Sequence, residues 1–168
     1  MSRGSKGSAC DHRPMTSSPD EATSTREHGG SEPAGSSYDW YQRAVALLDN
    51  GNSDAAAALF ARVREADPTS ACALEGYARA LFDGRRYAEA AEAFAELAER
   101  SPAEDYAHYG LGMSLWRLQR FPEARNELAM AAVMRPGRPE YTSALSQVKA
   151  TLRARALGGL PLEGPIST

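Results

Sequence analysis

Three prolines stand at one constant interval in this chain: Pro68, Pro102 and Pro136 follow one another every 34 residues. The same interval relates further sets of small and apolar residues, which are Ala56, Ala90 and Ala124; Phe60, Phe94 and Leu128; and Leu47, Leu81 and Leu115. A fixed period of this length indicates stacked copies of one supersecondary unit. Because one unit cannot bury its apolar face alone, the sequence predicts a solenoid with a shared core.

Each period contains two stretches with apolar residues at helical spacing. One such face consists of Tyr87, Ala90, Ala91, Phe94, Leu97 and Ala98. Alanine, the strongest helix former, is abundant, and turn signals such as Asn50-Gly51-Asn52 and Asp83-Gly84 separate the stretches. The pattern predicts an all-α fold of seven antiparallel helices, with boundaries near residues 51, 69, 85, 103, 120 and 137.

The repeated positions follow the pattern W-x2-L-G-x2-Y, then A-x3-F, then P. The matching residues are Trp40, Ala44, Leu47, Ala56, Phe60 and Pro68; Leu74, Tyr77, Ala78, Leu81, Ala90, Phe94 and Pro102; and Leu111, Gly112, Leu115, Ala124, Leu128 and Pro136. Arg43 and His108 depart from it. The chain therefore resembles the tetratricopeptide repeat (TPR) family. The resemblance implies a right-handed α-solenoid of three helix–turn–helix repeats plus a C-terminal capping helix.

Three parts are expected along the chain. Residues 1–36 lack Val, Ile, Leu, Phe, Trp and Tyr, so they cannot offset their ordering entropy and are expected to form a disordered N-terminal tail. Residues 37–157 form the TPR domain, with repeats 37–70, 71–104 and 105–138 and a cap helix at 139–157. Residues 158–168, rich in Gly and Pro, are expected to form a flexible tail.

The resemblance also implies a binding surface, because the first helix of each TPR repeat lines the concave face. Carried over by repeat phase, the candidate groove residues are Tyr38, Tyr41, Val45, Leu48, Arg79, Phe82, Asp83, Tyr106, Tyr109, Met113, Trp116 and Arg117, with Asp49, Cys72 and Glu75 at further positions of the same phases. Six of the chain's 13 aromatic residues belong to this set. Exposed apolar patches usually mark interaction sites, and Tyr and Trp are enriched at binding hot spots.

Gly76 and Gly110 share one phase of the repeat. A glycine within a helix costs about 1 kcal/mol relative to alanine, so two copies at one phase indicate that something approaches the backbone closely there. The approaching group is a ligand chain or a neighbouring helix, and a neighbouring helix is the favoured interpretation.

We expect this chain to be a protein–protein interaction module that binds a peptide or helical segment of a partner in the concave aromatic groove. The alternatives are a chaperone for secreted or apolar client proteins and a self-associating structural scaffold, so a homo-oligomer is possible. TPR domains that clamp the C-terminal carboxylate of heat-shock chaperones use Lys, Asn and Arg where this chain has Tyr41, Val45, Tyr109 and Met113. Only Arg79 could serve, which argues against such a partner.

Other functional classes find little support in the sequence. No catalytic constellation, cofactor fingerprint or paired metal-ligand motif is present, so we expect no enzyme, no cofactor and no metal site. The net charge of −3 argues against nucleic-acid binding. The charge is uneven, with 7 basic and 13 acidic residues from Tyr38 to Asp105 but 8 basic and 3 acidic from Tyr106 to Leu157. We expect a cytoplasmic protein that does not bind membranes, and the Ala- and Arg-rich composition is typical of a GC-rich bacterial genome.

Overall fold

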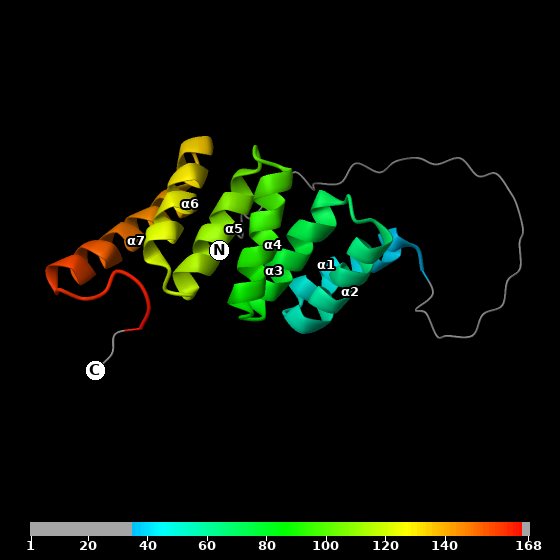
Figure 1. The fold of residues 1–168 in the computed structure, drawn as a ribbon. Helices are drawn as coiled ribbons and strands as arrows, with labels where there is room; N and C mark the ends of the chain where they lie inside the picture. The colour runs from blue at the N-terminus through cyan, green and yellow to red at the C-terminus, as the bar shows by residue number, and fades with distance from the viewer. Residues whose placement is uncertain (1–34, 166–168) are drawn as a thin grey trace, which may run out of the picture.

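A computed structural model describes residues 35–165. Within this span the chain forms seven α-helices and no β-strand, which confirms the predicted all-α fold (Figure 1). The helices are α1 (Ser37–Asp49), α2 (Ser53–Ala66), α3 (Ala71–Asp83), α4 (Tyr87–Arg100), α5 (Asp105–Arg117), α6 (Phe121–Met134) and α7 (Pro139–Leu157). Of the expected tail at residues 1–36, all but Gly35 and Ser36 lie outside the described residues.

The helices are stacked in the order of the sequence, as a solenoid requires (Figure 1). Each helix packs mainly against the next one along the chain. The odd-numbered helices also contact one another, in the pairs α1·α3, α3·α5 and α5·α7, whereas the even-numbered helices of the described chain do not. The odd-numbered helices therefore form the inner, closely spaced layer of the superhelix, and α2, α4 and α6 form the outer layer.

Local signals explain where the helices begin and how the chain turns between them. The Ser36 hydroxyl accepts a hydrogen bond from the backbone N–H of Asp39, whose carboxylate in turn accepts one from the backbone N–H of Ser36. This reciprocal capping satisfies two of the unpaired donors at the start of α1. Ser70 caps α3 through the backbone N–H of Ala73, which is a common use of serine at this position.

The turns after α1, α3 and α5 each contain one residue in the left-handed conformation. These residues are Gly51 (φ 78°), Arg85 (φ 60°) and Gln119 (φ 61°), which are again 34 positions apart. The turn signal at Asp83-Gly84 marks the correct loop, but Gly84 itself has a helical φ of −75°. Two repeats therefore place a side chain where glycine would be relaxed.

Arg85→Gly is expected to raise the free energy of unfolding by about 0.5 kcal/mol, because the left-handed conformation disfavours a Cβ by roughly 1–2 kcal/mol and glycine adds chain entropy to the unfolded state. Urea unfolding of the two proteins measures the difference. The converse control is Gly51→Ala. A Cβ added at Gly51 meets no neighbouring atom within 4 Å, so this substitution should lower stability through backbone strain alone. Equal stability of Arg85→Gly and the wild type would contradict the prediction.

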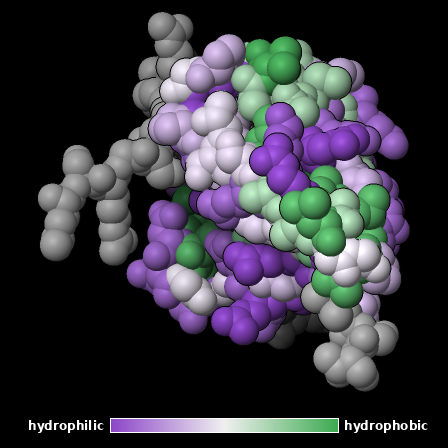
Figure 2. Space-filling view, turned by 90° about the vertical axis from the view of Figure 1, so that its left-hand side faces the viewer, coloured by the Kyte–Doolittle hydropathy of each residue, from purple (hydrophilic) through white to green (hydrophobic). Residues whose placement is uncertain are grey.

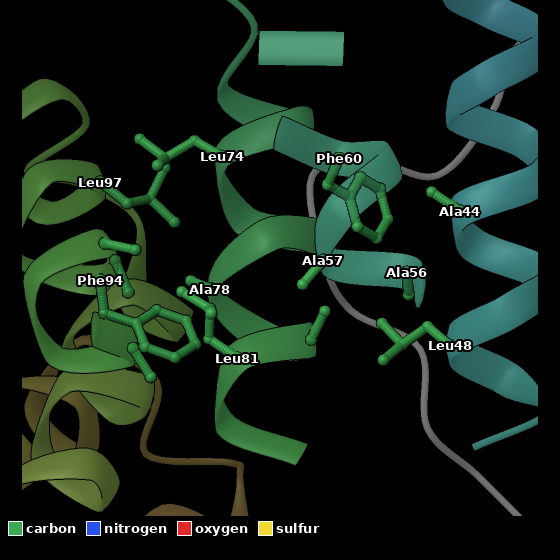
Figure 3. Close-up of a cluster of buried hydrophobic side chains, with 14 residues drawn as sticks. Ala44, Leu48, Ala56, Ala57, Phe60, Leu74, Ala78, Leu81, Phe94 and Leu97 are labelled. Carbon is green, nitrogen blue, oxygen red and sulfur yellow. The ribbon is translucent and has the colours of Figure 1, made fainter. Parts of the chain in front are cut away.

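Two clusters of buried side chains hold the stack together. The larger one joins α1 to α5 and contains Phe60 and Phe94, which are each 1% exposed (Figure 3). The smaller one joins α5, α6 and α7 and contains Leu128, Ala144 and Val148. Since both clusters draw on helices from neighbouring repeats, no repeat has a core of its own.

The shared phase of Gly76 and Gly110 is explained by these aromatic side chains. A Cβ placed on Gly76 would lie 2.4 Å from the Phe60 ring, and one on Gly110 would lie 2.4 Å from the Phe94 ring. Each phenyl ring comes from the outer helix of the preceding repeat and covers the backbone of the next inner helix. The close approach is therefore made by a neighbouring helix, as the sequence analysis favoured.

The last helix closes the stack through a buried polar contact. The Tyr141 hydroxyl, on a fully buried ring of α7, donates a hydrogen bond of 2.8 Å to Oδ2 of Asp105. The other carboxylate oxygen of Asp105 lies 3.1 Å from Nε of Arg135. Asp105 is thus buried with both oxygens paired, which offsets the cost of removing the carboxylate from water.

The residues after α7 fold back onto the solenoid. Gly164 donates its backbone N–H to the carbonyl oxygen of Gln119 at 3.1 Å. The Arg155 guanidinium donates to the carbonyl oxygens of Pro161 at 2.7 Å and Gly164 at 2.8 Å. Residues 158–165 are named the C-terminal segment here, and the flexibility expected for residues 158–168 stays a prediction.

Candidate functional site

A small cavity opens on the inner layer between α3 and α5. It has a volume of about 150 Å³ and is lined by Arg79, Phe82, Asp83, Phe94, Tyr106, Tyr109, Gly110 and Met113. All of these except Phe94 and Gly110 belong to the candidate groove set. The 34-residue phase therefore brings together side chains from two successive inner helices at one hollow, which is called the central cavity below.

A second and larger cavity lies at the C-terminal end of the solenoid. Its volume is about 1030 Å³, and its lining residues are Met113, Trp116, Arg117, Gln119, Phe121, Gln147, Thr151, Ala154, Arg155, Leu160 and Pro165. It is called the C-terminal cavity below. Met113 lines both cavities, so the two hollows adjoin along α5. The surface over α3, α5 and α7 that contains both cavities is called the groove below.

The candidate residues of α1 line neither of these two cavities. Leu48 is 8% exposed and belongs to the large buried cluster. Tyr41 packs its ring edge-on against Phe60, with centroids 5.6 Å apart, and Val45 packs against the same cluster. Tyr38 is 60% exposed. Burial, with smaller effects of Glu75 and Arg79, raises the pKa of the Tyr41 hydroxyl, so Tyr41 lies near charged residues of α3. The α1 residues therefore lie outside these two cavities, and their place in a binding groove stays a prediction.

Aromatic rings form a continuous series through the groove. The Phe94 and Tyr106 centroids are 6.1 Å apart, those of Tyr106 and Tyr109 are 6.1 Å apart, and Tyr109 stacks on Tyr141 at 4.6 Å. Ring pairs at these separations stabilise one another beyond simple burial. The series links the buried core to the half-buried Tyr109, which holds this ring in a defined position at the groove.

Burial also shifts the pKa values of the groove's polar groups. It raises the pKa of the Tyr106 hydroxyl to about 12 and raises the pKa of Tyr109. A tyrosine hydroxyl is protonated at neutral pH even without such a shift, so both hydroxyls can donate hydrogen bonds. Partial burial raises the pKa of the Asp83 carboxyl, and the opposing effect of Arg79 lowers it less. Arg79 and Asp83 place one charge of each sign at the central cavity.

Possible metal ligands do not gather in one place within residues 35–165. This span contains no group of three or more His, Cys, Asp or Glu side chains that could hold a metal ion. His108, which departs from the repeat pattern, lies with its Nδ1 2.8 Å from Oε2 of Glu127. In the same span, no helix is long and apolar enough to cross a membrane.

Several groove residues were not anticipated from the sequence. Gln147 and Thr151 of α7 line the C-terminal cavity, and they follow Met113 and Arg117 by 34 positions. Extending the repeat phase into the cap helix would have identified both residues. Leu160 and Pro165 of the C-terminal segment also line the cavity, and no repeat phase applies to them.

Comparison with known proteins supports the repeat architecture. The family described as "Tetratricopeptide repeat" matches residues 41–105 and, overlapping, residues 78–139. No curated protein sequence matches the chain.

Solved structures share the fold at low sequence identity. The first TPR of Spaghetti (RPAP3), bound to the HSP90 peptide SRMEEVD, has a TM-score of 0.67 and 19% identity, covering 70% of this chain and 93% of that chain. MamA from Desulfovibrio magneticus RS-1 has a TM-score of 0.68 and 18% identity, and the match covers 74% of this chain and 70% of that chain. The type III secretion translocator chaperone SycD of Yersinia enterocolitica has a TM-score of 0.60 and 18% identity, and the match covers 73% of this chain and 84% of that chain.

Proposed function

This chain belongs to the tetratricopeptide repeat family, and we propose that it binds a peptide or helical segment of another protein along the groove over α3, α5 and α7. The general role of a protein-interaction module follows from the family. The proposal adds the location of the binding surface and the means of recognition.

The observation that carries the proposal is that the two cavities adjoin at Met113. A groove bounded by successive inner helices suits an extended or helical segment, whose side chains follow one another at regular intervals. Tyr109 and Trp116 supply large, partly exposed rings of the type enriched at hot spots. Arg79, Asp83 and Arg117 supply charges that can fix the register of the bound segment.

The groove is chemically unlike a clamp for a chain-terminal carboxylate. The positions where such clamps carry basic and amide side chains are occupied by Tyr41, Val45, Tyr109 and Met113. Of these, Tyr41 and Val45 pack against the buried cluster, and Tyr109 stacks on Tyr141. We therefore propose a partner other than the carboxylate tail of a heat-shock chaperone, although one structural neighbour is bound to an HSP90 peptide.

Two alternatives remain distinct from this proposal. A chaperone for apolar client segments would use the same groove, and the likeness to a translocator chaperone is a likeness of fold. A self-associating scaffold would use the groove for a second copy of the chain. Sedimentation velocity of the purified protein separates the latter, because a scaffold forms larger species without any added partner.

Replacing both Tyr109 and Trp116 by alanine is expected to weaken partner binding at least about tenfold, because two aromatic anchors of the groove are lost. The partner is recovered from a peptide-display selection against the full chain, and its dissociation constant is measured for each variant. The matched control is Val133→Ala on the outer helix α6, where 76% of the side chain is exposed. Far-ultraviolet circular dichroism establishes that each variant is folded.

Equal affinity of the folded groove variant and the wild type would overturn the proposed binding surface. A loss of affinity in Val133→Ala alone would move the site to the outer layer. A groove variant that unfolds would show that both rings belong to the core, which also contradicts the proposal.

A further inference from the structure

The C-terminal cavity carries charge of one sign only. Arg117 and Arg155 are among its lining residues, whereas no Asp or Glu of the described chain lines it. The central cavity differs, because Arg79 is accompanied there by Asp83. A cavity with two cations and no carboxylate is electrostatically complementary to an anionic group. Figure 2 looks onto this end of the molecule, where hydrophilic and hydrophobic side chains are interspersed.

Arg155 is the more unusual of the two cations. Its residue exposure is 7%, and its guanidinium donates to two backbone carbonyl oxygens, of Pro161 and Gly164. It also lies over the Phe121 ring, 4.7 Å from the centroid. No ion pair to a carboxylate of the described chain neutralises it. The carbonyl oxygens hold the guanidinium but carry no net charge, so the positive charge of Arg155 stays at the wall of the cavity.

The second cation is accessible to a ligand. Arg117 is exposed at the end of α5, with its guanidinium 5.9 Å from the centroid of Tyr87. An arginine can pair with a carboxylate through two parallel hydrogen bonds. Its exposure leaves the guanidinium free to adopt that geometry, while the field of Arg155 adds to its attraction for an anion.

The remaining wall of the cavity is largely apolar. Met113 and Trp116 come from α5, Phe121 begins α6, and Leu160 belongs to the C-terminal segment. Arg155 holds this segment in place through the two carbonyl contacts. The volume of about 1030 Å³ exceeds that of one side chain, so an apolar side chain and its neighbours along a peptide can enter together.

We infer that the C-terminal cavity binds a peptide segment in which a carboxylate side chain adjoins a large apolar side chain. Arg117 pairs with the carboxylate, Trp116 and Met113 contact the apolar side chain, and the C-terminal segment forms the far wall. This inference rests on the proposed function and adds the chemical class of the bound segment.

A peptide-display selection with random peptides against the full chain tests the inference. The selected peptides are expected to be enriched in Asp or Glu next to Leu, Phe or Trp. The same selection against Arg117→Gln should lose the acidic enrichment and retain the apolar one. The matched control is Arg125→Gln, which removes an exposed arginine of α6 that bonds to Asn126 and lines neither cavity; it should select acidic peptides as the wild type does.

The best selected peptide is then synthesised with its acidic residue intact and with Gln in its place. Fluorescence anisotropy with the wild type should show about five- to tenfold weaker binding of the Gln peptide, and this difference should shrink at high salt because screening weakens the ion pair. For Arg117→Gln, the two peptides should bind with nearly equal affinity. This double comparison isolates the contact between Arg117 and the carboxylate.

The outcomes separate the inference from the proposed function. Selected peptides that bind the groove but lack acidic enrichment, or that are enriched in Lys and Arg, overturn the inference alone. A selection that enriches no peptide overturns the proposed function itself. Concentration-dependent dimers that dissociate in Arg117→Gln would assign the cavity to a second copy and overturn the inference. If deletion of residues 166–168 makes peptide binding more than tenfold tighter, the cavity is occupied by the chain's own C-terminal residues, and the inference is again overturned.

Discussion

Phe94→Ala is expected to lower the free energy of unfolding by about 3–5 kcal/mol, the usual cost of truncating a buried phenylalanine. Phe94 is 1% exposed in the larger core cluster. Its ring covers the backbone of Gly110 on the next repeat and packs edge-on against Tyr106. The substitution therefore removes contacts between the second and third repeats and enlarges the adjoining central cavity.

Urea unfolding monitored by circular dichroism measures this loss. In a solenoid, stability is the sum of repeat terms and interface terms, so damage to a central interface affects both sides of the stack. Val133→Ala, at an exposed position of α6, is the control and should change stability by less than about 0.5 kcal/mol. A change of that small size in Phe94→Ala would show that the ring is not part of the shared core.

The 34-residue phase was sufficient to predict the helices and the core partners. Phe60, Phe94 and Leu128 occupy one phase and are all buried, because identical backbone units place side chains of one phase in equivalent directions. The same reasoning identified Gly76 and Gly110 as points of close approach. Patterns of this kind are visible in the sequence since the physical constraint recurs in each copy.

Phase defines the direction of a side chain but not its depth. Leu48, Phe82 and Trp116 share one phase, yet Leu48 is 8% exposed and the other two are only partly buried. The depth depends on what neighbouring helices supply at each level. Phe82 packs against the larger core cluster from outside and contacts Tyr87 edge-on, whereas Leu48 is itself a buried member of that cluster. These differences arise from individual neighbours that no repeat position encodes.

The packing of the C-terminal segment on the solenoid could not be predicted from sequence patterns, for a related reason. Its main contacts join Arg155 to backbone carbonyl oxygens and the backbone N–H of Gly164 to Gln119. Every residue carries a backbone carbonyl, so such partners leave no signature in the residue types. The wall of the C-terminal cavity therefore became apparent only from the folded chain.

Gly110→Ala is expected to lower the free energy of unfolding by about 2 kcal/mol. The added Cβ would lie 2.4 Å from the Phe94 ring, and a buried ring in a packed core cannot move aside freely. Overpacking costs up to about 3 kcal/mol, and the higher helix propensity of alanine returns about 1 kcal/mol. Gly137→Ala is the matched control, since a Cβ there meets nothing within 4 Å.

The third repeat indicates how the clash can be relieved. There Leu128 replaces the phenylalanine, and Ala144, 34 positions after Gly110, replaces the glycine; both side chains lie in the smaller core cluster. A smaller side chain on the outer helix, leucine in place of phenylalanine, is thus paired with a larger residue on the next inner helix, alanine in place of glycine. The double variant Gly110→Ala/Phe94→Leu copies this pair into the interface between the second and third repeats. It should be more stable than Gly110→Ala alone, although Phe94→Leu by itself is destabilising.

Urea unfolding of the wild type, the two single variants and the double variant gives the coupling free energy. If the stability losses of Gly110→Ala and Phe94→Leu simply add in the double variant, the two side chains do not compete for the same space. That result would contradict the proposed size complementarity between outer and inner helices of successive repeats.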